Sequence, residues 1–176
     1  DKVWRSLQDI RSSGRAGKIG ASIYSGEDID RLIERYDIDI VHVPINGLDS
    51  RLVDGGQLDA LAARGVEVHA RSIFLQGLLL TPPERLPAKF AALAPALVQM
   101  RQAFTKAGLS IIEGLVAAVF RYQMIDRVIV GAASLREFRE IVSAADRLTS
   151  TEIDNSSWRW PDVDQRFLNP ALWGTL

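Results

Sequence analysis

The sequence contains no cysteine, and only two of its 176 residues are histidine. The absence of cysteine excludes a disulfide framework, a thiolate metal site and a cysteine nucleophile. The two histidines, His42 and His69, leave little material for a zinc site, and we expect no bound metal. Both lie in apolar segments, where a packed or hydrogen-bonded histidine is the more frequent outcome.

An excess of charge of one sign is also missing, since the sequence has 21 basic and 22 acidic residues and a formal net charge of -1. A near-neutral chain has no electrostatic attraction to nucleic acid or anionic lipid, so we expect neither as a partner. The longest apolar run, from Leu109 to Phe120, contains Glu113 and is too short for a membrane span. No leader pattern follows Asp1, so we expect a cytoplasmic protein. Because the first residue is not Met, we also expect the chain to be a fragment of a longer one.

The sequence does contain an alternation of strand-like and helix-like segments. Apolar and β-branched runs predict strands at 18–24, 38–45, 66–70 and 127–130. Helical periodicity predicts helices near 3–10, 29–36, 57–64, 90–104 and 110–123, and from 134 onward. A parallel crossover needs a connecting element, so this alternation predicts an α/β fold of parallel βα units.

Serines open several of these helices. Ser25 and Ser110 are predicted N-caps, because each precedes a helical segment with an acidic residue in its first turn. Ser134-Leu-Arg-Glu137 is a capping-box candidate, in which serine and glutamate satisfy each other's amide groups. The long insertion after the third strand, with prolines between 82 and 87, is of the kind that shapes sites in α/β proteins.

We expect residues 1–148 to form four βα units and residues 149–176 to form an irregular tail that packs on them through its tryptophans. Two architectures fit these units, half of a TIM (β/α)8 barrel and an open doubly wound sheet. A complete barrel takes about 250 residues, so 176 residues supply only part of one. Strands that neighbour one another in sequential order would exclude the open sheet.

Four stretches resemble the C-terminal half of the aldo/keto reductases, a family of NAD(P)H-dependent (β/α)8 barrels. They follow the order and spacing of the family's last four strands, and they are Gly17–Tyr24, Asp37–Asn46 with Leu48, Val66–Leu78 and Gly114–Ser134. The resemblance implies a truncated half-barrel. It also implies NADP or NAD as the cofactor, bound across the carboxyl ends of the strands.

Roles carried over from the family give a cofactor half-site. The implied positions are Ser22, His42, Asn46, Arg71, Ser72, Leu75, Gly77, Gly131, Ser134 and Glu140. Ser22 and His42 correspond to positions that hold the nicotinamide amide, and Asn46 to an asparagine beside the cofactor strand. The loop Ser72–Gly77 corresponds to the segment that crosses the pyrophosphate, Gly131–Ser134 to a phosphate turn, and Glu140 to an adenine contact.

Several of these positions differ from the family pattern. His42 replaces a usual glutamine, Arg71 an aromatic that stacks on nicotinamide, and Ala133 a basic residue for the 2′-phosphate. A planar guanidinium can also stack on an aromatic ring. The competing structural interpretations are an ion pair for Arg71, a turn for Gly77 and a helix cap for Ser134. The choice between NADP and NAD stays open.

The resemblance implies that proton transfer depends on residues outside this chain. The family protonates the carbonyl oxygen with a tyrosine, tuned by lysine, aspartate and histidine, on the first four barrel strands. A general acid must lie within hydrogen-bond reach of the reacting oxygen. We expect no catalytic residue here, because the tyrosines and lysines of this chain do not match the positions of the tetrad. They are Tyr24, Tyr36, Tyr122, Lys2, Lys18, Lys89 and Lys106.

Two functional hypotheses follow. In the first, the chain is the C-terminal part of an NAD(P)H-dependent oxidoreductase, completed by a missing N-terminal half-barrel and acting on a small carbonyl substrate. The tail segments Trp158–Pro161 and Asn169–Trp173 resemble members linked to polysaccharide sugars, which favours a sugar-derived carbonyl. In the second, it is a catalytically silent half-barrel that assembles as a homo-oligomer or with a partner, because open strand edges and apolar flanks drive association.

Overall fold

In the computed structural model, which describes residues 2–175, four parallel strands form one sheet in the order β1-β2-β3-β4. They are β1 (Gly20–Ser22), β2 (Ile40–Pro44), β3 (Glu67–Arg71) and β4 (Arg127–Val128). Sequential order is that of a barrel segment and excludes a doubly wound sheet, in which the strand order reverses. The predicted α/β fold of parallel βα units is confirmed, with β1, β2 and β4 shorter than the sequence predicts.

The chain divides into two compact units. Unit 1 contains the sheet and comprises Asp1–Pro44, Ser50–Arg71 and Gln123–Ile129. Unit 2 comprises Ile45–Asp49, Ser72–Tyr122 and Val130–Leu176. The separate division at residue 148, between βα units and tail, stays a prediction.

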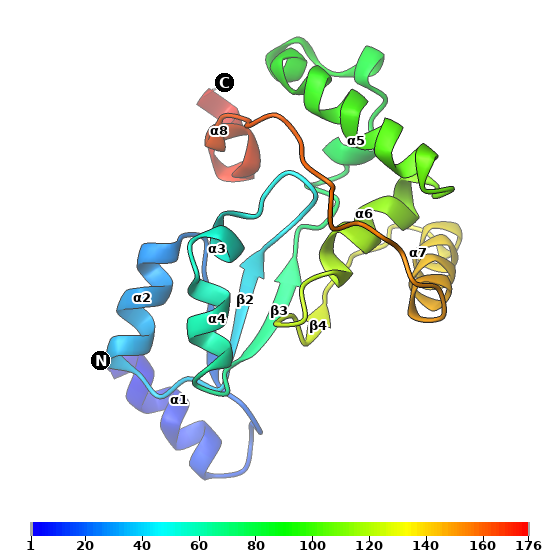
Figure 1. Cartoon of the computed structure of the whole chain (residues 1–176). Helices are drawn as coiled ribbons and strands as arrows, with labels where there is room; N and C mark the ends of the chain where they lie inside the picture. The colour runs from blue at the N-terminus through cyan, green and yellow to red at the C-terminus, as the bar shows by residue number, and fades with distance from the viewer. Residues whose placement is uncertain (1, 176) are drawn as a thin grey trace. The chain divides into compact units, whose positions relative to one another are not determined.

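Unit 1 contains the helices α1 (Lys2–Ser12), α2 (Gly26–Arg35), α3 (Arg51–Asp54) and α4 (Gln57–Ala62). Of these, α2 and α4 lie side by side next to the strands and cover one face of the sheet (Figure 1). Alternate strand residues point into this layer, and the core side chains with 0% exposure are Ile29, Val41, Val43, Leu58, Leu61, Val68 and Ala70. The polar residues of β2 and β3 therefore lie on the opposite face.

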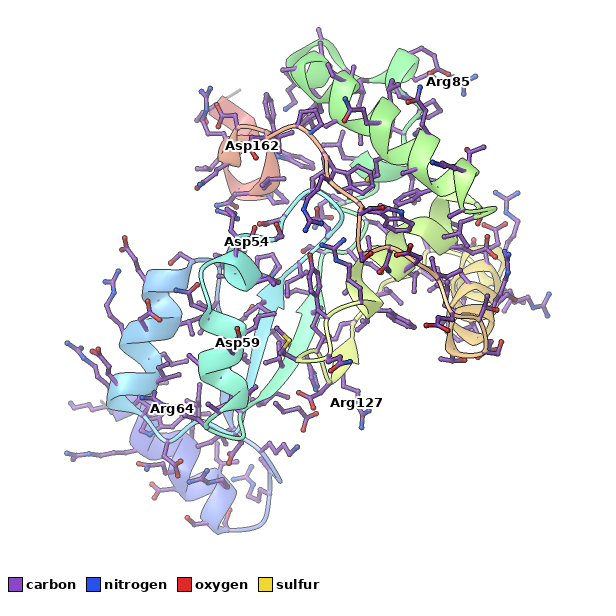
Figure 2. All side chains as sticks on the ribbon, viewed as in Figure 1. Asp54, Asp59, Arg64, Arg85, Arg127 and Asp162 are labelled. Atoms are coloured by element: carbon purple, nitrogen blue, oxygen red, sulfur yellow. The ribbon has the colours of Figure 1, made fainter. Side chains whose placement is uncertain are left out.

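Two arginines connect elements of unit 1. Arg11 donates from Nη1 to both carboxylate oxygens of Asp39, at 2.8 and 2.9 Å, and Asp39 also accepts from the amide of Ile19 at 2.8 Å. Burial opposes ionisation of Asp39, but these hydrogen bonds outweigh it and hold its pKa below the ordinary value. Arg64, labelled in Figure 2 beyond the end of α4, donates to the carbonyl of Ile33 at 2.6 Å.

Unit 2 is a helical assembly around its own apolar core. Its elements are η1 (Leu78–Leu80), η2 (Pro83–Arg85), η3 (Ala88–Leu93), α5 (Ala94–Lys106), α6 (Ile111–Phe120), α7 (Leu135–Thr149), α8 (Gln165–Leu168) and η4 (Pro170–Thr175). The tail contributes directly to this core, since Trp158 packs on Phe104 with ring centroids 4.9 Å apart and Trp173 packs on Phe90 at 4.8 Å. Large aromatic areas of this kind dominate burial energetics.

Among residues 2–175, no single helix is both long and apolar enough to cross a membrane. The bent pair formed by Ala88–Lys106 and Ile111–Phe120 meets the requirement jointly, by length and composition only.

Candidate functional site at the carboxyl ends of the strands

The register of the sheet places three of the polar side chains in one row. Ser22 of β1 is opposite His42 of β2, and His42 is opposite His69 of β3. Arg71 is the last residue of β3, two residues beyond His69. The structure thus gathers the predicted residues Ser22, His42 and Arg71 at the carboxyl ends of neighbouring strands, where α/β proteins bind their ligands.

Arg71 is held in place by residues of β1 and the loop after it. Its Nε donates to Ser22 Oγ at 3.2 Å, and its Nη2 donates to the carbonyl of Ile23 at 3.4 Å. The guanidinium carbon lies 4.2 Å from the ring centroid of Tyr24, a cation–π contact. The expected ability of Arg71 to stack is therefore used here on a tyrosine of the chain itself.

His42 and His69 form a stacked pair, with ring centroids 5.1 Å apart and planes inclined by 19°. Burial, followed by the neighbouring His69 and Arg71, lowers the pKa of His42 below its ordinary value. Burial and Arg127 likewise lower the pKa of His69, with Asp126 opposing them. His69 Nε2 is also 2.6 Å from a carboxylate oxygen of Glu67, which ion-pairs with Lys18. A neutral imidazole offers one donor and one acceptor.

Asn46 lies in unit 2, two residues after the end of β2 and within the turn that it forms with Asp49. Its side chain is buried, with 2% exposure, and its Oδ1 accepts from the amide of Leu48 at 2.9 Å. Its Nδ2 is also buried and has no hydrogen-bond partner among the described residues. A buried donor without an acceptor is uncommon and needs an explanation.

The loop after β3 has an unusual backbone. Ser72, Leu75 and Gln76 have φ angles of 61°, 46° and 54°, and Gly77 follows at 82°. Left-handed conformations suit glycine but cost conformational energy for other residues. Leu75 adopts one, and its side chain is fully buried. Within the loop, the amide of Leu75 donates to the carbonyl of Ser72 and the amide of Gly77 to the carbonyl of Phe74, at 2.9 Å each.

The turn Gly131–Ser134 is exposed and leads into α7. Ser134 is the N-cap, and its Oγ accepts from the amide of Glu137 at 3.2 Å, so the helix-cap interpretation is confirmed. The predicted capping box is wrong in one respect, because the Glu137 carboxylate bonds the amide of Ala133 at 2.8 Å and not that of Ser134. Glu140 pairs with Arg136 at 3.6 Å on the exposed side.

The predicted site residues thus fall into local groups inside each unit. Sequence reasoning missed the partners that shape these groups, namely Tyr24 beneath Arg71, His69 against His42, and the amide of Ala133 that the Glu137 carboxylate accepts from. The two-residue spacing of His69 and Arg71 on one strand was the available signal, since it places both on one face. Within residues 2–175, no cluster of three or more histidine, aspartate or glutamate side chains is arranged to hold a metal ion.

A parallel sheet of βα units in sequential strand order is the arrangement of a segment of an α/β barrel. The profile of the aldo/keto reductase family matches residues 1–158. The chain belongs to the aldo/keto reductase family. A comparison with curated protein sequences gave no match.

Solved structures agree on the fold. A thermostable aldo-keto reductase in complex with epalrestat matches with a TM-score of 0.62 and 17% sequence identity. The match covers 87% of the present chain and 50% of the chain of that structure. The holo form of an aldo-keto reductase from Bacillus halodurans matches with a TM-score of 0.67 and 18% sequence identity. This match covers 81% of the present chain and 47% of the chain of that structure. Glycerol dehydrogenase from Gluconobacter oxydans matches with a TM-score of 0.54 and 17% sequence identity. This match covers 88% of the present chain and 57% of the chain of that structure. The chain therefore spans about half the length of the structures it matches.

Proposed function

We propose that the chain is the cofactor-binding, C-terminal portion of an NAD(P)H-dependent aldo/keto reductase-like oxidoreductase. The observation that carries the proposal is the loop after β3, where three non-glycine residues have positive φ angles. Strain of this kind costs on the order of 1–3 kcal/mol per residue and concentrates at ligand clamps and active sites. The loop also follows the carboxyl end of a parallel strand, where ligands of α/β folds bind.

The residues present fit a dinucleotide. The buried Nδ2 of Asn46 is a donor that lacks an acceptor among the described residues, and it suits an oxygen of the cofactor. His42, whose lowered pKa favours the neutral ring, has the donor and acceptor that a carboxamide complements. When bound, the nicotinamide supplies or accepts the hydride, and these groups bind and orient it.

The proton donor belongs, in this proposal, to strands outside residues 1–176. Tyr24 lies beneath Arg71, and Tyr122 lies beside Arg121 with the guanidinium carbon 4.8 Å from its ring centroid. These contacts do not reproduce the tyrosine–lysine pair of the family. The partner is then the N-terminal half-barrel, and the substrate is a small carbonyl compound of the sugar-derived class. The cytoplasmic location stays a prediction.

The test is a titration of the purified protein with NADH and with NADPH, followed by the fluorescence of the reduced nicotinamide. We expect saturable binding of at least one dinucleotide and no carbonyl-dependent oxidation. Gly77→Val should weaken binding at least tenfold, because valine is strained at a φ of 82°. Gly17→Ala is the matched control, since a Cβ there meets nothing within 4 Å. Folded wild-type protein that binds neither dinucleotide would overturn the proposal.

A second candidate, the catalytically silent half-barrel that assembles with itself or a partner, rests on the apolar stripe of α7. We define this stripe as Leu135, Phe138 and Val142, which are 62%, 54% and 39% exposed. Their spacing places them on one face of the helix. In unit 1, β1 and β4 are the outer strands of the described sheet. A molar mass near the 19.5 kDa of one chain across a wide concentration range would count against assembly.

A further inference from the structure

Arg101 of α5 is a partly buried arginine whose guanidinium bonds one turn of the backbone. Its Nη2 donates to the carbonyls of Leu79, Leu80 and Thr81, at 3.3, 2.9 and 3.0 Å. Its Nε is buried and has no hydrogen-bond partner among the described residues. Burial lowers the pKa of Arg101, and the charge of Glu84 opposes this only in part. The guanidinium therefore serves the end of the short helix η1, where carbonyls lack partners within a helix.

The turn that Arg101 bonds is itself joined to the left-handed loop after β3. The amide of Leu78 donates to the carbonyl of Leu75 at 3.0 Å, and the amide of Leu80 donates to the carbonyl of Gly77 at 3.1 Å. Leu75 and Gly77 have φ angles of 46° and 82°. Because the carbonyl of Leu80 in turn accepts from Arg101, the arginine and the strained loop form one hydrogen-bonded assembly.

Arg101 reaches this turn from a helix that is fixed in the core of unit 2. Leu97, Met100 and Phe104 of the same helix are buried, with 0%, 0% and 1% exposure. A buried charge adds little net stability, because desolvation offsets its hydrogen bonds. Three bonds from a fixed helix do restrict the turn to one conformation, and left-handed residues persist only where their surroundings hold them.

We propose that Arg101 is a positioning residue, which holds the loop after β3 in the conformation that binds the dinucleotide. The inference rests on the proposed function, in which this loop contacts the cofactor. Arg101 acts through η1 and needs no contact with the cofactor itself. A loop that is already in its bound conformation loses less conformational entropy when the ligand arrives. Removing the guanidinium should therefore weaken binding beyond what its effect on folding explains.

The experiment measures the dissociation constants of NADH and NADPH by fluorescence titration of the full chain, and hydrogen exchange of residues 72–81 in the ligand-free protein. Arg101→Leu removes all three bonds, so we expect about tenfold weaker binding and faster exchange. Arg101→Lys keeps a cationic donor on a shorter side chain, so we expect about threefold weaker binding and a smaller rise in exchange. Arg85→Leu, at an exposed position on η2 that Figure 2 labels, is the matched control and should change neither quantity.

A second control separates positioning from stability. Ser110→Ala removes the cap of α6 in the same unit, so it should lower the unfolding free energy without weakening dinucleotide binding. Equal weakening by Ser110→Ala and Arg101→Leu would assign the effect to general destabilisation and overturn the inference. A folded Arg101→Leu or Arg101→Lys protein with the affinity or the loop exchange of wild type would also overturn it, and the proposed function would stand. Folded wild-type protein that binds neither dinucleotide overturns both.

Discussion

His42 and His69 lie face to face on neighbouring strands, with ring centroids 5.1 Å apart. Each ring is partly buried, and Arg71 adds a positive charge near His42. Protonating both rings would place two more cations in contact. The lowered pKa values favour the neutral form of both rings, so the stability of unit 1 depends on pH through this pair.

This coupling predicts that the protein loses stability in mild acid. Because the folded-state pKa of His42 is lowered, the unfolded chain binds more protons than the folded one as the pH falls below about 6.5. The contribution of neutral His42 to the free energy of unfolding is fully present above that pH, and it is lost as the pH falls toward the folded-state pKa. Urea unfolding between pH 7.5 and 5 should show the decrease, and His42→Gln should reduce it. If the unfolding free energies of wild type and His42→Gln fell equally with pH, the prediction would be contradicted.

Gly114→Ala should destabilise unit 2, although alanine favours helices more than glycine does. A Cβ at Gly114 would overlap the ring of Phe104, whose side chain is 1% exposed in the core. Overpacking of this kind typically costs about 1–3 kcal/mol of unfolding free energy. In a double-mutant cycle with Phe104→Leu, which frees space, the losses should be less than additive. Additive losses would show that the two residues do not clash.

Ser110→Ala should lower the unfolding free energy by about 1 kcal/mol, the usual cost of a lost N-cap. Ser110 Oγ accepts from the amide of Glu113 at 3.3 Å, and the Glu113 carboxylate accepts from the amide of Ser110 at 2.7 Å. These are the two bonds of a complete capping box on a mostly buried helix. Ser143→Ala, at an exposed position inside α7, should change stability by less than about 0.5 kcal/mol. Chemical denaturation of both variants distinguishes them.

The apolar stripe of α7 should cause concentration-dependent association. Exposed apolar surface that is contiguous marks interaction sites, and three large side chains share this face. We expect Phe138→Asp to shift the molar mass measured by light scattering toward that of one chain. Val98→Asp removes an apolar side chain of 40% exposure from α5 and should leave the mass unchanged. An equal effect of both substitutions would assign association to general hydrophobicity.

Much of the fold could be predicted because its signals are local. Apolar runs and helical periodicity located all four strands and most helices to within a few residues. The helix predicted over 90–104 divides into η3 and α5 around the proline at 95, since proline suits only a first helical turn. The short α3 was not predicted, because four residues carry too little periodicity.

The predicted site residues came from the family resemblance. The side chains that contact them in the structure could not be predicted in the same way. Tyr24 beneath Arg71 joins residues 47 positions apart, and the His42–His69 stack depends on a strand register that no local pattern encodes. The free Nδ2 of Asn46 and the left-handed loop after β3 are likewise properties of packed backbone.

By itself, the sequence determined the α/β class, the parallel pairing of its βα units, the serines that cap its helices and the family to which it belongs. These depend on periodicity and on contacts between residues a few positions apart. The tertiary structure alone decided the order of the strands in the sheet, which polar groups meet and which buried donor lacks an acceptor among the described residues. The physical reason is that hydrogen bonds and stacking act over a few ångströms, so they depend on where the chain returns in space.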